Sequence, residues 1–200
     1  MTLIGLTGRI GVGKSLASAC LKELGAAVID ADLVGHQIIA PGTPAYNEII
    51  AAFPGDFLKP GGAIDRKKLG VIVFGDATGA FVRRLNQITH PQISRIIRQT
   101  IADYKRVGYV HIVVEAALLL QCDLVDQVDV IWLITAPEKV VLNRLQQRDG
   151  MGQQQAEARM AAQSSEAVQR AAADLVIVND GDREQLKKKL TAAYLALPER

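Results

Sequence analysis

One stretch near the amino terminus constrains the fold more than any other: residues 5–18 read GLTGRIGVGKSLAS and follow an apolar run. Gly8 and Gly13 frame four residues, and Lys14 and Ser15 come next. In this pattern the glycines let the backbone fold around an anion, the lysine reaches the outer phosphates, and the hydroxyl binds Mg²⁺. A helix that starts after the loop adds its positive end. The stretch therefore predicts a strand, a phosphate-binding loop and a helix that bind ATP or GTP.

Five apolar, β-branched runs recur along the chain, and segments of helical periodicity separate them. The runs are continuously apolar, which is typical of parallel strands covered on both faces. We therefore expect an α/β fold with a five-stranded parallel sheet, flanked by helices, in the order 2-3-1-4-5. The loop-bearing strand then lies in the middle of the sheet. The expected strands are residues 2–7, 26–30, 110–115, 128–134 and 174–179.

Two connections are too long for simple crossovers between strands. Residues 31–109 contain several Pro- and Gly-rich turns, which favours an inserted helical lobe, and residues 148–165 are polar with a helical centre. We expect a single domain with a lobe for the acceptor substrate and a lid. The core is expected over residues 1–32, 110–147 and 170–200, the acceptor lobe over 33–109 and the lid over 148–169.

Two helix starts carry capping signals. Thr135 precedes Glu138 by three residues, the spacing of a capping box. Asp65 stands directly before the helical pattern that begins at Arg66. We expect Thr135 and Asp65 to be N-cap residues.

Composition and charge exclude several kinds of partner. The formal net charge is only +2, and the densest basic cluster, residues 187–189, fits the solvated face of a terminal helix, so we expect no nucleic-acid partner. The opening residues lack the regions of a signal peptide, and no apolar run is as long as a membrane span. We expect a cytoplasmic protein with no membrane partner. Cys20 and Cys122 lie in apolar contexts and are expected to be buried free thiols in a reducing compartment.

Missing motifs argue against two classes of nucleotide-binding protein. A GTPase should carry Asn-Lys-x-Asp on a late strand, whereas residues 178–182 read VNDGD. A motor ATPase should end a strand in an acidic pair, whereas the third strand ends in a lone Glu115. Both absences disfavour a switch or a motor.

A small-molecule kinase needs a carboxylate near the γ-phosphate and a lid that excludes water. Asp30 and Asp32 stand at the expected end of the second strand, where, if the strand continues, alternation turns only one of them toward the phosphate. Both also fit helix capping. Arg144 and Arg148 are four residues apart, hence on one helix face, where the fourth strand's helix enters the lid. Arginines in that place neutralise charge on the transferring phosphoryl group.

Together these sequence features resemble those of the dephospho-coenzyme A kinase family. Members of that family use ATP to phosphorylate the 3′-hydroxyl of dephospho-CoA, in the last step of coenzyme A synthesis. The resemblance covers nearly the whole chain. Its motifs are GLTGRIGVGKS (5–15), DAD (30–32), APGTPA (40–45), IDRKKL (64–69), LNQITHPQI (85–93), LNRLQQRDG (142–150), RMAAQ (159–163) and ADLVIVNDG (173–181).

The resemblance implies a P-loop kinase fold with an acceptor lobe and a lid, and a role for each matching residue. Asp32 matches the base for the 3′-hydroxyl, with Lys14, Arg144 and Arg148 as further catalytic residues and Mg²⁺ held at Ser15. His90 either bonds the substrate or holds two helices at a break made by Pro91. The implied ATP-binding residues are Gly8, Gly11, Val12, Gly13, Lys14, Ser15 and Leu16, and the implied substrate-binding residues are His36, His90 and Gln163.

The chain also departs from the family pattern, at Arg9, Val12, Leu16, His36, Ala117 and Gln121. Three functions stay open at this point. The first is an ATP:dephospho-CoA 3′-phosphotransferase, with ATP and dephospho-CoA as its partners. The second is a nucleoside or nucleotide kinase of the same architecture, and the third is a non-catalytic nucleotide-binding regulatory module. No oligomeric state follows from the sequence.

Overall fold

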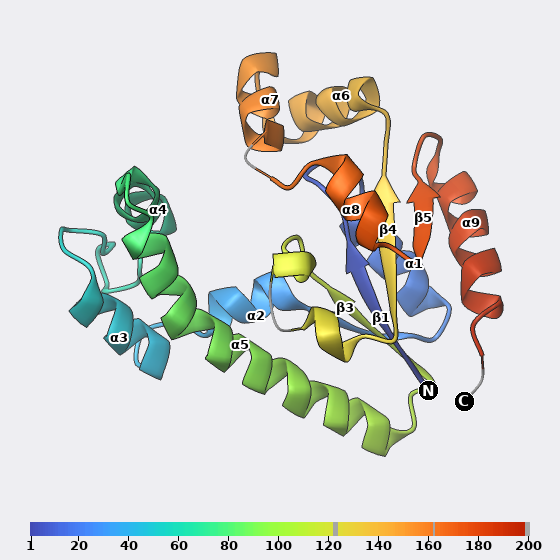
Figure 1. Ribbon diagram of the computed structural model, residues 1–200, viewed down its shortest axis with the longest axis horizontal. Helices are drawn as coiled ribbons and strands as arrows, with labels where there is room; N and C mark the ends of the chain where they lie inside the picture. The colour runs from blue at the N-terminus through green and yellow to red at the C-terminus, as the bar shows by residue number, and fades with distance from the viewer. Residues whose placement is uncertain (122–123, 162, 199–200) are drawn as a thin grey trace. The chain divides into compact units, whose positions relative to one another are not determined.

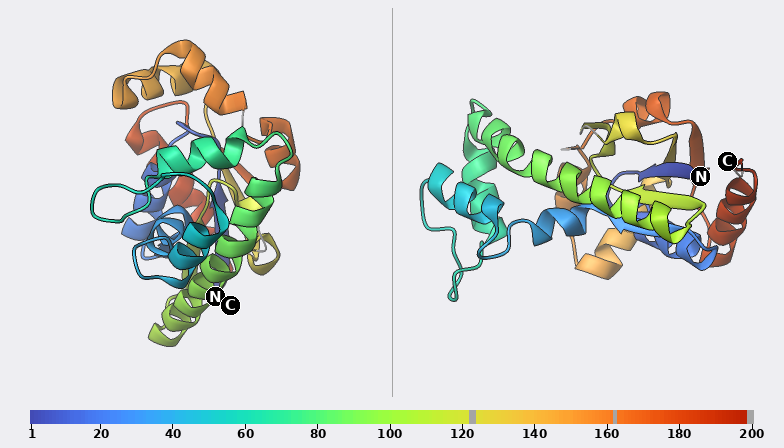
Figure 2. Two further views of the ribbon diagram at one scale, coloured as in Figure 1. Left: turned by 90° about the vertical axis from the view of Figure 1, so that its left-hand side faces the viewer. Right: turned by 90° about the horizontal axis from the view of Figure 1, so that it is seen from below.

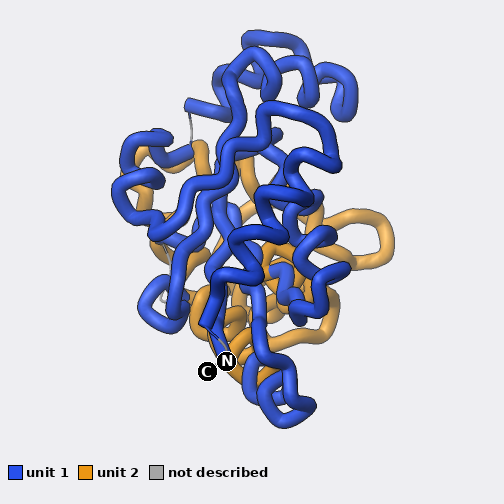
Figure 3. The backbone as a smooth tube through the Cα atoms, turned by 90° about the vertical axis from the view of Figure 1, so that its right-hand side faces the viewer, with its two compact units in different colours: residues 1–30, 101–200 blue, residues 31–100 orange. Residues whose placement is uncertain are grey.

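The computed structural model describes residues 1–121, 124–161 and 163–198. The chain forms two compact units (Figure 3). The sheet unit comprises Met1–Asp30 and Ile101–Arg200, and the helical unit comprises Ala31–Thr100. Cys122, one of the two predicted buried thiols, lies outside the described residues.

The sheet unit is built on five parallel strands in the order β2-β3-β1-β4-β5 (Figure 1). The predicted fold class, strands and strand order are confirmed. Every residue of β1 is buried, as expected for a central strand covered on both faces. The strands are β1 (Thr2–Thr7), β2 (Ala27–Asp30), β3 (His111–Glu115), β4 (Val130–Thr135) and β5 (Leu175–Val178).

Helices cover both faces of this sheet. α1 and α9 pack against each other and against the strands on one face, and α8 packs on β4 on the other (Figure 1). The start of β1 and the segment that follows α9 lie near each other (Figures 1 and 2), and the Thr2 hydroxyl donates a hydrogen bond to the Pro198 carbonyl. The helices of this unit are α1 (Lys14–Glu23), α6 (Glu138–Asp149), α7 (Gln153–Ala161), α8 (Glu166–Ala172) and α9 (Arg183–Leu195), with short 3₁₀ turns η1 (Leu119–Gln121) and η2 (Val125–Gln127).

Parallel pairing gathers the carboxyl ends of the strands at one edge, and this positions the site. Leu6 of β1 lies level with Glu115 of β3, and Thr7 lies level with Leu133 of β4. The loop that follows β1 therefore starts beside the ends of β3 and β4. The sheet below this edge is fixed by a buried apolar core that includes Ile4, Leu6, Val113, Trp132, Ile134, Leu186 and Leu190.

The helical unit holds the four helices α2 (Ala31–Gln37), α3 (Pro44–Ala52), α4 (Arg66–Gly75) and most of α5 (Ala80–Val107). Asp65 is the N-cap of α4, and its carboxylate accepts hydrogen bonds from the N–H groups of Lys67 and Lys68. The predicted cap is confirmed. These hydrogen bonds, that of Lys68 first, hold the pKa of the Asp65 carboxyl below its ordinary value.

Two local predictions are wrong, and the condition for a third is not met. Thr135 is the last residue of β4 and not an N-cap, because its backbone is paired within the sheet. The N-cap of α6 is Pro137. α5 runs unbroken through Pro91, so His90 holds no pair of helices at a break. β2 ends at Asp30 and the chain turns helical at Ala31, so Asp32 lies in the first turn of α2 and strand alternation does not orient it.

Two predictions, the burial of Cys20 and the place of the basic cluster on a terminal helix, are confirmed. Cys20 is a fully buried free thiol. The basic cluster lies on α9, where Lys187 pairs with Glu23 and Lys189 pairs with Asp180. Over the same described ranges, no helix is both long and apolar enough to cross a membrane.

Candidate active site

The phosphate-binding loop connects β1 to α1 and turns on glycines. Gly13, the residue before α1, has φ +97°, in the left-handed region that favours glycine. Gly8 has φ +153°, and a Cβ there would overlap the Ile134 carbonyl oxygen of β4. Backbone conformation and close approach therefore both require glycine at the two ends of the loop.

Lys14 is the first residue of α1 and turns back over the loop. Its Nζ donates to the Gly8 carbonyl at 2.8 Å and to the Arg9 carbonyl at 3.4 Å. The first turn of α1 carries no acidic residue, so the lysine charge adds to the positive end of the helix. The loop is therefore suited to an anion.

A buried carboxylate lies next to the loop hydroxyl. Glu115, 7% exposed at the end of β3, accepts hydrogen bonds from Ser15 Oγ at 3.3 Å and from Ser18 Oγ at 2.5 Å. A hydroxyl and a carboxylate are hard oxygen ligands of the kind Mg²⁺ prefers. From the sequence, Glu115 was recognisable only as a lone acidic residue where a motor ATPase carries a pair. Its position at the carboxyl end of the strand beside β1 is the signal that could have found it.

Asn179 and Arg144 meet the loop from the other side. Asn179 Nδ2 donates to the Val12 carbonyl at 2.8 Å, and Arg144 Nη2 donates to Asn179 Oδ1 at 3.3 Å. Arg144 Nη1 also lies 3.4 Å from the Val12 carbonyl oxygen. Sequence reasoning predicted Arg144 here but missed Asn179, although the ADLVIVNDG motif contains it.

A cavity of about 420 Å³ opens beside these groups. Arg144 and Arg148 both line it from α6, which agrees with their expected place on one helix face. Arg148 also forms an ion pair with Asp149 at 2.8 Å, and this hydrogen bond lowers the pKa of the Asp149 carboxyl. The remaining lining residues are Gly11, Gly13, Leu16, Leu145, Gln147, Asn179, Gly181, Asp182 and Arg183.

Hydrogen bonds join the predicted lid to the loop. Gln163 Oε1 accepts from the Ile10 N–H at 2.8 Å, and the Arg9 guanidinium donates to the Met160 carbonyl. Gln163 is thus brought to the loop backbone. Arg9, noted above only as a departure, ties the loop to α7.

The other predicted site residues belong to the helical unit. Asp32 and His36 lie one turn apart on α2, and both are exposed. His90 is half-buried on α5. The structure thus brings Lys14, Ser15, Arg144, Arg148 and Gln163 together in the sheet unit, and Asp32 and His36 together on α2.

Comparison with known proteins decides the family. A family model described as dephospho-CoA kinase matches residues 2–185. A dephospho-CoA kinase of Moorella thermoacetica is 42% identical over 198 residues, which cover 98% of this chain and 92% of the relative. The chain belongs to the dephospho-CoA kinase family.

Solved structures agree with this assignment. The dephospho-CoA kinase of Campylobacter jejuni matches with a TM-score of 0.69 and 26% identity, covering 96% of this chain and 95% of that one. A protein of Thermus thermophilus matches with a TM-score of 0.82 and 26% identity, covering 98% of each chain. The predicted family and the predicted class, an ATP-dependent kinase, are confirmed.

The departures from the family pattern lie within the matched region. Val12 is buried, and Leu16 lines the cavity described above. Ala117 precedes η1, which ends at Gln121. These differences therefore do not take the chain out of the dephospho-CoA kinase family.

Proposed function

We propose that this chain transfers the γ-phosphoryl group of ATP to the 3′-hydroxyl of dephospho-CoA, with Asp32 as the base and the loop around Lys14 as the phosphate site. Membership of the dephospho-CoA kinase family gives the reaction. The observation that carries the residue roles is the gathering of Lys14, Ser15, Glu115 and Arg144 around one glycine-rich loop.

ATP is assigned to the sheet unit. Its phosphates fit the loop because the backbone N–H groups of a glycine-rich turn, the positive end of α1 and the Lys14 ammonium all favour negative charge. Its nucleoside fits the adjoining cavity, where Arg144 and Arg148 supply charge and Leu16 supplies apolar surface. The guanidinium groups are suited to neutralise charge that shifts during transfer.

Mg²⁺ fits the same site through oxygen ligands. Ser15 Oγ and the Glu115 carboxylate would hold it, and Ser18 keeps the carboxylate oriented by its own hydrogen bond. When bound, the ion neutralises charge on the phosphate oxygens. Glu115 is itself screened from solvent, which favours a fixed position for this ligand.

The acceptor is assigned to the helical unit and the lid. A ribose hydroxyl is a poor nucleophile, and its proton must be accepted during transfer. Asp32 is exposed in the first turn of α2, two residues after β2 ends at the carboxyl edge of the sheet, and its carboxylate is suited to orient the hydroxyl and accept that proton. His36, His90 and Gln163 are proposed to bind dephospho-CoA, and residues 148–169 to close over the site.

An acceptor panel tests the proposal. The protein is incubated with ATP and Mg²⁺, and ADP release is followed with dephospho-CoA, AMP, CMP, adenosine or shikimate. We expect dephospho-CoA to give a rate far above the others. A higher rate with a nucleoside monophosphate would replace the proposal by the nucleotide-kinase alternative, and no transfer to any acceptor would favour the regulatory module.

A further inference from the structure

Asn179 is a buried polar residue that lines the cavity assigned to the nucleoside, but the reaction described above gives its side-chain amide no role. It follows β5 directly and is only 2% exposed. Its backbone N–H donates to the Thr135 carbonyl of β4 at 2.7 Å, which continues the sheet pairing by one residue. The side chain therefore projects from a rigid element, as a group that sets site geometry must.

Both ends of the Asn179 amide are used. The NH₂ group donates to the Val12 carbonyl at 2.8 Å, and the oxygen accepts from Arg144 Nη2 at 3.3 Å. A carbonyl only accepts and a guanidinium only donates, so these two partners fix which way round the amide lies. Asn179 thus links the loop to Arg144 on α6.

The hydrogen bond to Val12 sets the direction of the next N–H group. The Val12–Gly13 peptide is trans and planar, so its C=O and N–H point in opposite directions. Asn179 and Arg144 hold the C=O on their side, and the Gly13 N–H therefore faces away from them. A Cβ on Gly13 would overlap the Asn179 amide nitrogen, so glycine at this position also permits the approach.

We propose that Asn179 is a positioning residue for phosphoryl transfer. By fixing the Val12–Gly13 peptide it aims the Gly13 N–H at a phosphate oxygen, and by accepting from Arg144 it holds that guanidinium beside the loop. The inference rests on the proposed function and deepens it. A donor that is aimed before the reaction stabilises developing charge without reorganisation, so loss of aim lowers the rate more than it weakens binding.

Two substitutions separate the two contacts. Asn179→Ala removes both. Asn179→Asp keeps an oxygen for Arg144 but cannot, as a carboxylate, donate to the Val12 carbonyl. If the peptide is the target of the positioning, both variants lose activity.

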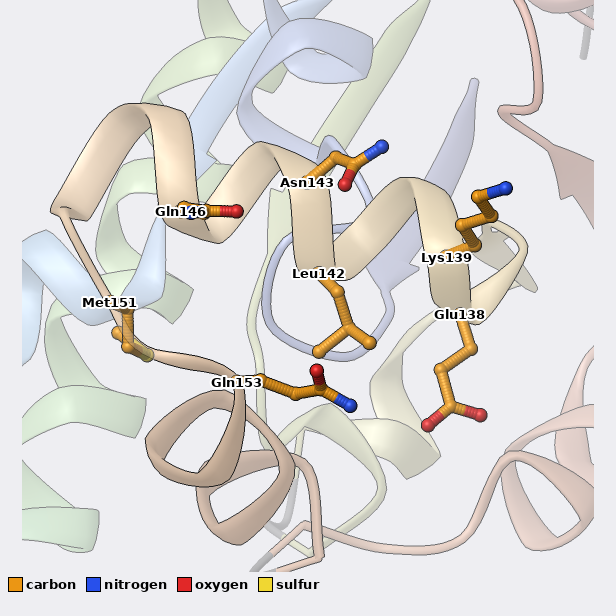
Figure 4. A pocket seen from close by; sticks show the side chains of 7 residues that line it. All are labelled: Glu138, Lys139, Leu142, Asn143, Gln146, Met151 and Gln153. Carbon is orange, nitrogen blue, oxygen red and sulfur yellow. The ribbon is translucent and has the colours of Figure 1, made fainter.

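Asn143→Ala is the matched control. Asn143 neighbours Arg144 on α6 but is exposed, and it lines a separate cavity of about 570 Å³ between α6 and the start of α7. Figure 4 shows its side chain pointing away from Leu142 and Gln153, which face each other across that cavity. This variant makes the same chemical change without touching the loop, and it should keep wild-type turnover.

The experiment measures kinetics and one NMR signal for all four proteins. For Asn179→Ala and Asn179→Asp we expect kcat with dephospho-CoA to fall about 100-fold, the cost of a misplaced reacting group, with a much smaller change in KM for ATP. In wild type and in the control, a nonhydrolysable ATP analogue with Mg²⁺ should move the Gly13 amide proton signal downfield. In both Asn179 variants this movement should be lost.

Two outcomes would overturn the proposal. Asn179 variants with lowered thermal stability but normal kcat and a normal Gly13 shift would show a merely structural role. Full activity of Asn179→Asp would show that the bond to Val12 is not needed. If Asn179→Ala does not fold, Asn179→Asp carries the test alone. If wild type does not phosphorylate dephospho-CoA, the proposed function fails, and the Gly13 shift still decides the role of Asn179.

Discussion

Lys14 is held over the phosphate-binding loop by two backbone carbonyls, and this fixes its charge where the outer phosphates of ATP are expected. Its charge should stabilise the transition state more than the bound substrate, because negative charge shifts among the phosphate oxygens during transfer. We predict that Lys14→Ala lowers kcat by about 10²–10³-fold, the range for one preorganised group. Steady-state kinetics with ATP varied would contradict this if kcat were unchanged and only KM rose.

Asp32 and Asp30 give a paired prediction at the end of β2. Asp32→Asn preserves size but removes the charge and basicity of the proposed base, so kcat should fall by about 10²–10⁴-fold. ATP affinity, measured by equilibrium titration, should change little, because the loop and Lys14 make the phosphate site. Asp30→Asn, on the last residue of the strand, should be much milder. The reverse order of effects would exchange the two roles, and wild-type turnover in both would exclude either carboxylate as the base.

Among single residues, those that belong to a short sequence motif could be identified from the sequence. Those whose place in the site depends on contacts with residues far away in the chain were missed. Lys14 and Ser15 follow from the spacing of glycines in one loop. Glu115 and Asn179 are brought to the loop by β3 and β5, over separations of about a hundred residues or more along the chain. Their neighbours in the sequence do not show that these two side chains reach the loop.

Helices and strands, like single residues, could be predicted where the signal is local and were mispredicted where contacts distant in the sequence decide. The strands were predictable because both faces of each are covered, which leaves continuous apolar runs. The role of Thr135 could not be predicted in the same way. The Thr-x-x-Glu spacing is a local signal for an N-cap, whereas the hydrogen bonds that hold Thr135 in a strand come from the neighbouring strand of the sheet. Thr135 is paired with Val178 of β5, and its carbonyl accepts from the Asn179 N–H. α6 therefore starts later, after Pro137.

The N-terminus of α4 gives a pH-dependent prediction. Hydrogen bonds from the backbone N–H groups of Lys68 and Lys67 lower the pKa of Asp65. A carboxyl group whose pKa is lower in the folded state stabilises the fold above its unfolded pKa, and this contribution is lost as the pH falls through the folded pKa. Asp65→Ala should therefore lower Tm at pH 7, and the difference from wild type should shrink below about pH 4. A difference that stays constant down to pH 2.5, measured by circular dichroism, would contradict the cap.

The α6–α8 region gives a prediction about motion. α6 ends at Gly150, which has φ +62°, and the bonds from Ile10 to Gln163 and from Arg9 to Met160 attach the segment to the loop. A glycine at the end of α6 suits the hinge of a lid that closes on substrate. Hydrogen exchange over residues 148–165 should slow when an ATP analogue and dephospho-CoA are both bound. Equal exchange with and without ligands would indicate a fixed insertion.

For the whole molecule, the proposed nucleotide-binding residues and the proposed acceptor-binding residues of α2 belong to different units. The sheet unit carries the phosphate-binding loop, Glu115, Arg144 and the nucleoside cavity, and the helical unit carries Asp32 and His36. This division predicts that changes on α2 affect the acceptor and the transfer step, whereas changes in the loop affect ATP. His36→Ala should accordingly raise KM for dephospho-CoA and leave KM for ATP nearly unchanged, measured with each substrate varied in turn. The opposite pattern would remove His36 from the acceptor site.

The central claim, transfer to one particular hydroxyl, is tested most directly by removing that hydroxyl. Wild-type protein is given ATP and Mg²⁺ with either dephospho-CoA or its 3′-deoxy analogue, and ADP release is followed while the product is analysed by ³¹P NMR. We predict rapid ADP release with dephospho-CoA, a new phosphomonoester signal on the ribose 3′-oxygen, and no phosphorylated product from the deoxy analogue. Equal phosphorylation of the deoxy analogue, or a phosphate at another position, would contradict the account.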